Sequence, residues 1–225
     1  MTEPFSNLQA AIVDLDGTLV DTVGDFTVAL NAMLAELALP AVAAADVALR
    51  VGKGSEHLIG SVLERGGAPP GLNAVAWEAY QRHYLRINGQ HATVYPGALE
   101  GLNLLRKRGL RLACLTNKPT GFAIPLLRDK GLDHYFDHVF GGDAFARKKP
   151  DPLPLVKTCE ALGTAAARTL MIGDSSNDAL AARAAGCPVL LVTYGYNHGE
   201  PIRAVDADGF LDSIADAAAW VDAHS

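Results

Sequence analysis

Four short apolar runs, separated by segments of helical periodicity, constrain the fold of this chain most strongly. Buried strands that alternate with helices are typical of a doubly wound, parallel α/β sheet. We therefore predict a Rossmann-like core. Its strands are expected at residues 10–15, 111–116, 169–172 and 189–193, with a weaker fifth at 138–140. Its helices are expected at 97–108, 119–130, 152–162, 177–185 and 213–223.

One connection is much longer than the others. About ninety residues separate the first run from the second, whereas a single crossover helix needs far fewer. Within this stretch, helical patterns cover 25–39, 55–65 and 73–87. We predict a small helical cap domain over residues 22–94, inserted into an α/β core made of residues 1–21 and 95–225.

The composition restricts the partners of the protein. A net charge of −6 and an isoelectric point near 5.6 argue against nucleic acid and anionic membranes. Neither an export signal nor a membrane-spanning run is evident. The three cysteines are widely spaced without metal-ligand spacing, as expected of reduced thiols. We expect a cytoplasmic protein; the sequence carries no signal for its oligomeric state.

The segment Asp14-Leu15-Asp16-Gly17-Thr18 directly follows the first apolar run. In extended backbone, residues two apart point to the same side, so both carboxylates can converge on one cation or substrate. An EF-hand loop is excluded because its sixth position, here Leu19, requires glycine. A solvated, Asp-rich turn remains the alternative for this segment alone.

Three further polar segments follow predicted strands, at the edge where α/β folds bind ligands. They are Thr116-Asn117, Lys148-Lys149-Pro150 and the segment from Asp174 to Asp178. Each has an ordinary explanation: Thr116 or Asp174 could cap a helix, and a loop lysine is usually solvated. Together, however, carboxylates for Mg²⁺, a carboxylate nucleophile, a hydroxyl and a lysine indicate phosphoryl transfer.

These four segments, in this order, resemble the four motifs of the haloacid dehalogenase superfamily. Within it, three segments resemble the bacterial phosphoglycolate phosphatases: Thr116-Asn117-Lys118-Pro119, Lys148-Lys149-Pro150 and Thr193-Tyr194-Gly195-Tyr196-Asn197. Asp151 departs from that branch, where histidine is often found. The resemblance covers nearly the whole chain.

The resemblance implies a role for each site residue. Asp14 attacks phosphorus and becomes an aspartyl-phosphate, while Asp16 protonates the leaving oxygen and later takes a proton from water. Thr116 and Lys149 bind phosphate oxygens. The Mg²⁺ ion is held by the Asp14 carboxylate, the Asp16 backbone carbonyl and Asp174, with Asp178 in support.

Substrate contacts are also expected beyond the phosphate. Asn117 is placed among the substrate-binding residues next to Thr116. In the cap, Arg50 or Lys53 is expected to pair with a substrate carboxylate, because neighbouring Gly52 and Gly54 allow close approach to a ligand. A surface lysine in a flexible hinge is the alternative.

The expected activity is Mg²⁺-dependent hydrolysis of a small phosphate ester, foremost 2-phosphoglycolate to glycolate and phosphate. Halide-expelling and phosphonate-cleaving members of the superfamily lack an acid at the position of Asp16, so this residue favours oxygen-linked esters. Alternatives are a sugar-phosphate mutase and a phosphatase for muramic acid phosphate or pyrophosphate. A non-catalytic phosphate-ligand binding protein is a further alternative.

Overall fold

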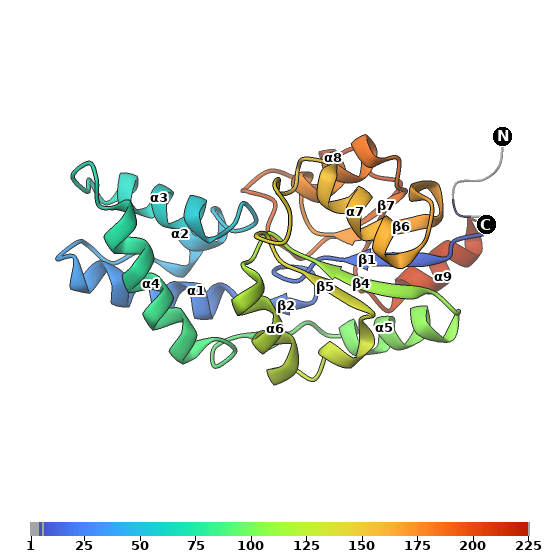
Figure 1. The fold of residues 1–225 in the computed structure, drawn as a ribbon, viewed down its shortest axis with the longest axis horizontal. Helices are drawn as coiled ribbons and strands as arrows, with labels where there is room; N and C mark the ends of the chain where they lie inside the picture. The colour runs from blue at the N-terminus through green and yellow to red at the C-terminus, as the bar shows by residue number, and fades with distance from the viewer. Residues whose placement is uncertain (1–4, 6, 225) are drawn as a thin grey trace.

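A computed structural model describes residue 5 and residues 7–224, and its core is a parallel sheet of six strands (Figure 1). The strand order is β5-β4-β1-β6-β7-β8, and every neighbouring pair is parallel. The strands are β1 (Ala10–Val13), β4 (Arg111–Leu115), β5 (His138–Phe140), β6 (Thr169–Gly173), β7 (Val189–Val192) and β8 (Gly209–Leu211). The predicted doubly wound α/β fold is confirmed.

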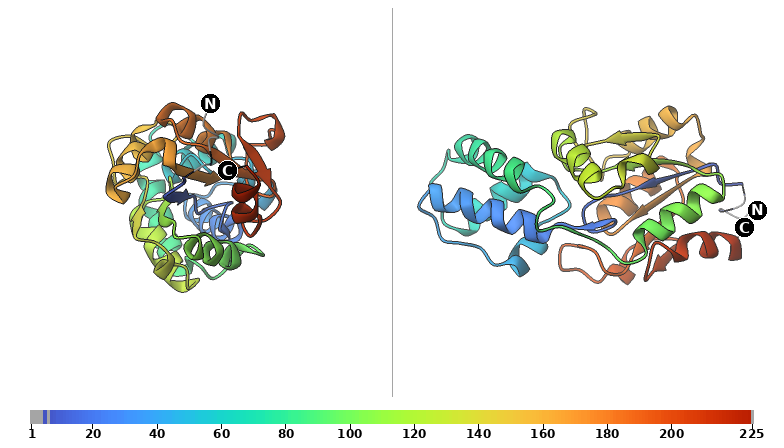
Figure 2. Two further views of the ribbon diagram at one scale, coloured as in Figure 1. Left: turned by 90° about the vertical axis from the view of Figure 1, so that its right-hand side faces the viewer. Right: turned by 90° about the horizontal axis from the view of Figure 1, so that it is seen from below.

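Helices cover both faces of this sheet (Figure 2). Along β1, Ala11 and Val13 pack with α5, α6 and α9, whereas Ala10 and Ile12 pack with α7 and α8. Burial on both faces explains why the strands are continuous apolar runs. These helices are α5 (Ala98–Lys107), α6 (Thr120–Asp129), α7 (Leu153–Leu162), α8 (Ser176–Ala185) and α9 (Asp216–Ala223). Short 3₁₀ turns lie at Asp133–Tyr135, Ala166–Arg168 and Ile202–Ala204.

Four further helices form a separate group beyond the carboxyl ends of the strands (Figures 1 and 2). They enclose an apolar core of their own, which includes the buried rings of Tyr80 and Tyr84. A short antiparallel pair, β2 (Val20–Asp21) and β3 (Thr93–Val94), joins this group to the sheet. The helices are α1 (Val23–Glu36), α2 (Ala44–Ala48), α3 (Ser55–Arg65) and α4 (Asn73–Ile87).

Some elements differ from the sequence prediction. The edge strand β8 was not predicted, because three residues that begin with glycine carry little strand signal. Gly209 is required there, since a Cβ atom would lie 2.4 Å from Cζ2 of Trp220. The brief α2, β2 and β3 were also missed, and α9 begins at Asp216 rather than at residue 213. None of the helices within the described residues has the length and apolar character needed to cross a bilayer.

Candidate active site

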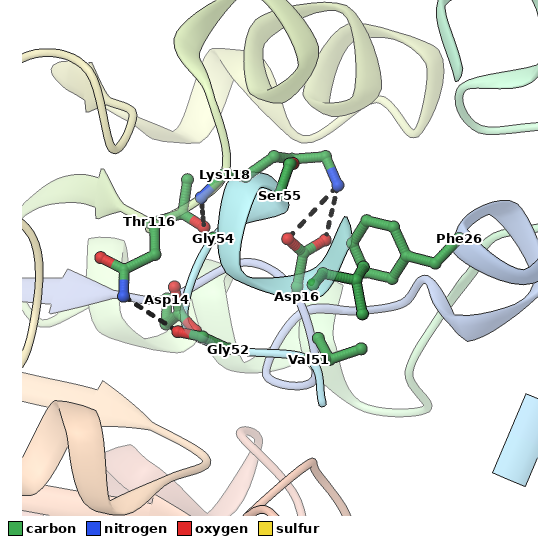
Figure 3. A pocket seen from close by; sticks show the side chains of 11 residues that line it. Asp14, Asp16, Phe26, Val51, Gly52, Gly54, Ser55, Thr116 and Lys118 are labelled. Atoms are coloured by element: carbon green, nitrogen blue, oxygen red, sulfur yellow. Dashed lines mark hydrogen bonds and ion pairs between the residues drawn. The ribbon is translucent and has the colours of Figure 1, made fainter. Parts of the chain in front are cut away.

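A pocket lies between the carboxyl ends of the strands and the helical group (Figure 3). Asp14 and Asp16 both line it, as the spacing of the two carboxylates predicts. Its remaining lining residues come from both sides: Phe26, Val51, Gly52, Gly54, Ser55, Leu58, Thr116, Asn117 and Lys118.

Lys149 joins two of the predicted acidic residues. Its ammonium lies 2.9 Å from Oδ1 of Asp14 and 2.6 Å from Oδ1 of Asp178, and it donates a hydrogen bond to the Leu115 carbonyl at 2.8 Å. The side chain of Lys149 is only 3% exposed. This lysine is therefore buried and paired rather than solvated, and its three N–H donors face three protein oxygens.

Asp14, Asp174 and Asp178 form a buried acidic cluster at the end of the sheet. One carboxylate oxygen from each lies within 4.8 Å of the others. Burial and the charge of Asp178, opposed by the Lys149 ammonium, together raise the pKa of Asp14 from 3.8 to about 7. Burial, followed by the charges of Asp178 and Asp14, also raises the pKa of Asp174 well above its usual value. The cluster therefore holds more negative charge than Lys149 offsets.

The cluster fits a hard cation. Oδ1 of Asp14 is buried and, despite its ion pair with Lys149, accepts no hydrogen bond of good geometry among the described residues. Three converging carboxylates supply the oxygen ligands that hard divalent cations prefer. The Asp16 carboxylate is not part of this cluster. This arrangement is compatible with a metal contact through the Asp16 backbone carbonyl alone.

Two glycines make room for the Asp174 carboxylate. A Cβ atom on Gly17, whose φ is +87°, would lie 2.0 Å from Oδ2 of Asp174, and one on Gly195 would lie 2.2 Å from its Cβ. The backbone N–H of Tyr196 donates to Oδ2 at 2.6 Å, and the Thr18 hydroxyl donates to Oδ1 at 3.4 Å. The chain segments around Gly17 and Gly195 therefore fix the position of this carboxylate.

Asp178 holds the start of α8 together. Its Oδ2 accepts hydrogen bonds from the backbone N–H groups of Asp174 and Ser175, both at 3.2 Å, and from the Ser175 hydroxyl. Ser175, not Asp174, is the N-cap of α8, in a capping box with Asp178. The alternative of Asp174 as a helix cap was therefore wrong, and its carboxylate is left for the cluster.

The side chains of Thr116 and Asn117 make different hydrogen bonds. Thr116 is not a helix cap, because α6 begins at Thr120; its hydroxyl oxygen accepts the N–H of Lys118 at 3.2 Å. The Asn117 amide donates to the carbonyls of Gly52 and Lys149 and accepts the N–H of Lys149. Asn117 thus ties three chain segments together at the pocket, and a contact of its side chain with substrate stays a prediction.

Lys118 is the main site residue that the sequence analysis left without a role. Its buried ammonium lies 2.9 Å from Oδ1 and 3.3 Å from Oδ2 of Asp16 (Figure 3). It also faces the rings of Phe26 and Tyr84, with 4.4 and 4.8 Å to the centroids. Its place directly after Thr116 and Asn117 was the available signal.

The two cap cations of the prediction do not join this site. Lys53 is exposed and is not among the residues that line the pocket, although Gly52 and Gly54 on either side of it are. The Arg50 guanidinium donates to the Asp46 carbonyl within the helical group. The structure brings Lys118 to the pocket instead.

A family model for haloacid dehalogenase-like hydrolases matches residues 8–186. The chain belongs to this family. Among curated proteins, this haloacid dehalogenase-like hydrolase is 43% identical over 217 residues to the phosphoglycolate phosphatase of Thiobacillus denitrificans, covering 95% of this chain and 96% of that protein. It is 45% identical over 206 residues to the plasmid phosphoglycolate phosphatase of Cupriavidus necator, covering 91% and 89%.

Two solved structures illustrate that other proteins share this fold. A predicted phosphoglycolate phosphatase from Haemophilus somnus superposes with a TM-score of 0.89 at 31% identity, covering 94% of this chain and 97% of that one. CbbY from Rhodobacter sphaeroides, solved in complex with phosphate, has a TM-score of 0.81 at 25% identity, covering 96% and 99%. The resemblance inferred from the sequence is confirmed at the level of family and fold.

Proposed function

We propose that this hydrolase is a Mg²⁺-dependent phosphatase that converts 2-phosphoglycolate to glycolate and inorganic phosphate. The observation that carries the proposal is that Asp14 and Asp16 line one pocket at the strand ends. Lys149 lies 2.9 Å from Asp14, and Asp174 belongs to the same acidic cluster as Asp14. Relatives named phosphoglycolate phosphatase, 43% and 45% identical over nearly full length, support this substrate.

In the proposed reaction, an oxygen of Asp14 forms a bond to phosphorus while the ester bond to the substrate oxygen breaks. Asp16 gives its proton to the leaving oxygen, which departs as an alcohol. A water then attacks phosphorus, Asp16 takes a proton from that water, and the bond to Asp14 breaks to release phosphate. Two easier displacement reactions at phosphorus thus replace one difficult reaction.

Two neighbours prepare Asp14 and the phosphate for this reaction. Lys149, 2.9 Å from Asp14, orients the nucleophile and offsets part of the local negative charge. The Thr116 hydroxyl lines the pocket and already accepts the N–H of Lys118, so its own hydrogen is available for a phosphate oxygen.

The proposed metal ligands are Asp14, Asp174 and the Asp16 backbone carbonyl, with Asp178 in support. When bound, Mg²⁺ would neutralise charge on the transferring phosphoryl group. Asp178 already bonds to Lys149 and to the start of α8, so its contribution is to hold the neighbouring ligands in place. The buried carboxylates, two of which have raised pKa values, support this assignment.

We further propose that residues 22–94 act as a cap over a core of residues 1–21 and 95–225. The pocket beneath the helical group has a cavity volume of only about 20 Å³, enough for about one water molecule. We therefore expect the cap to move away from the core when a phosphate ester enters. A site covered in this way favours a small metabolite and excludes bulk water. The three free, buried cysteines support the expectation of a cytoplasmic enzyme.

The proposal is tested by phosphate release from 2-phosphoglycolate with Mg²⁺, beside hexose phosphates, muramic acid phosphate and pyrophosphate. We expect stoichiometric phosphate and glycolate, loss of turnover with EDTA, and recovery on addition of Mg²⁺. An isomeric ester in place of free phosphate would indicate a mutase. No product from any ester of the panel would indicate a binding protein.

A further inference from the structure

The Lys118 ammonium is buried and faces the pocket, and its contacts with the described residues do not use all of its hydrogen-bond donors. Its side chain is 0% exposed. The two carboxylate oxygens of Asp16 are its only hydrogen-bond acceptors among the described residues. Lys149, the other buried lysine of the site, instead has oxygens of three separate residues within 2.9 Å of its ammonium. An ammonium carries three donors, so Lys118 can bind a further anion that enters the pocket.

Aromatic rings from the cap hold this ammonium in place. Phe26 of α1 and Tyr84 of α4 present their faces to it, at 4.4 and 4.8 Å from the ring centroids. Such contacts stabilise a desolvated cation without using its N–H donors. The Tyr84 hydroxyl is buried and has no hydrogen-bond partner among the described residues. The aromatic contacts therefore hold the ammonium beside Asp16 and leave its N–H donors available.

The position of Lys118 relative to Asp16 defines what it can reach. Under the proposed function, the Asp16 carboxylate contacts the ester oxygen of the substrate. In 2-phosphoglycolate a single methylene group separates that oxygen from the carboxylate. A cation 2.9 Å from Asp16 is thus next to the place where the carboxylate of such a substrate must lie.

We infer that Lys118 is the receptor for the substrate carboxylate and makes the enzyme selective for phosphate esters of small 2-hydroxy acids. This inference rests on the proposed function. It assigns to Lys118 the role that the sequence analysis gave to Lys53, which is exposed and outside the pocket lining. Phe26, Val51 and Leu58 line the same pocket and restrict it to a short carbon chain. A charge-assisted hydrogen bond in this buried position strongly favours a carboxylate over a methyl group.

The test compares two esters that differ only in this group, 2-phosphoglycolate and ethyl phosphate. For wild-type enzyme we expect kcat/KM to be about 100-fold or more higher for 2-phosphoglycolate, as for sites built to bind a polar substrate group. In Lys118→Met and Lys118→Gln, we expect this ratio to collapse towards one, with the larger loss on 2-phosphoglycolate. Lys107→Met, an exposed position on α5, is the matched control and should keep the ratio. Thermal unfolding of each variant verifies the fold.

Several outcomes would overturn the inference. Equal losses on both esters would mean that Lys118 acts only through Asp16. An unchanged ratio in the Lys118 variants, or a ratio lost in Lys53→Met instead, would place the receptor elsewhere. If neither Lys118 variant folds, equal kcat/KM of the wild-type enzyme for both esters would also refute the inference. Absence of phosphate release by wild-type enzyme from 2-phosphoglycolate would instead refute the proposed function.

Discussion

Tyr196 links Asp174 of the acidic cluster to the chain segment that connects the core with the helical group. Its backbone N–H donates to Oδ2 of Asp174 at 2.6 Å. Its hydroxyl donates to Oδ1 of Asp21 in β2 and accepts the Thr22 N–H at 3.1 Å. The backbone and the side chain of one residue thus serve two different parts of the molecule, and substitution can separate them.

Replacing Tyr196 with phenylalanine tests this separation. We expect the free energy of unfolding to fall by about 1–2 kcal/mol, because Thr22 N–H and Asp21 lose a partly buried partner. The affinity for Mg²⁺ should not change, since the backbone N–H still binds Asp174. Urea unfolding and Mg²⁺ titration measure the two effects. Tyr135→Phe is the control, because the Tyr135 hydroxyl accepts a hydrogen bond from the Asn103 side chain and contacts neither Asp21 nor Thr22. A large loss of Mg²⁺ affinity in Tyr196→Phe would contradict the prediction.

Gly195→Ala is predicted to damage the proposed metal site. The new Cβ would lie 2.2 Å from Cβ of Asp174 and 2.4 Å from its Oδ2, so the carboxylate must move. We expect Mg²⁺ affinity to fall at least about tenfold and stability to fall by about 1–3 kcal/mol, as in overpacked sites. Calorimetric Mg²⁺ titration and urea unfolding are the measurements.

The matched control for this variant is Gly121→Ala. A Cβ at that position of α6 meets no atom within 4 Å. Alanine should therefore raise stability by about 0.5–1 kcal/mol through its better helix propensity, without changing Mg²⁺ affinity. If both alanine variants bound Mg²⁺ like the wild type, the packing explanation for Gly195 would be wrong.

The acidic cluster predicts how stability depends on pH without metal. The pKa of Asp14 is raised from 3.8 to about 7 by burial, and that of Asp174 is raised as well. The folded state therefore binds more protons than the unfolded state over this range, so stability must fall as pH rises from about 4 to 7. Thermal unfolding in EDTA should show this decrease. Added Mg²⁺ should reduce it, because metal binding favours the deprotonated carboxylates. A melting temperature in EDTA that increases across this range would contradict the prediction.

Asp14→Asn is expected to separate activity from stability. Loss of the nucleophile should lower kcat by at least about 10⁴-fold. At pH 8 without metal, however, the variant should be at least as stable as wild type, because it removes one of several buried, mutually repelling carboxylates. Lys149 keeps Asp178 as a counter-ion at 2.6 Å. Phosphate release and urea unfolding test both parts, and retention of turnover would remove the basis of the proposed mechanism.

The sequence predicted those features of the fold and the site that follow from short-range patterns and from the parallel topology of the sheet. Apolar runs ahead of Asp14, Thr116 and Asp174 predict buried parallel strands, and the carboxyl ends of such strands meet at one edge of the sheet. The side chains that follow them must then lie close together, as they do here. The extent of α3 and α4 was likewise predicted to the residue, because their apolar periodicity is strong.

Contacts between distant segments could not be predicted from sequence patterns, in contrast to local ones. The capping box of Ser175 and Asp178 is a local contact, and its spacing in the sequence would have allowed its prediction. The use of the Asn117 amide as a tie to Gly52 and Lys149 could not, since each partner belongs to another loop. β8 escaped prediction because an edge strand of three residues depends on its neighbour β7 rather than on its own pattern.

The amino-acid sequence alone thus determined the α/β core and the set of acidic, hydroxyl and lysine side chains at its strand ends, because strand burial and parallel topology act through local pattern. Only the tertiary structure decided which cation faces the pocket. Lys53 and Lys118 have the same chemistry, but rings brought from α1 and α4 enclose Lys118 beside Asp16 and leave Lys53 exposed. That choice depends on packing between residues far apart in the chain.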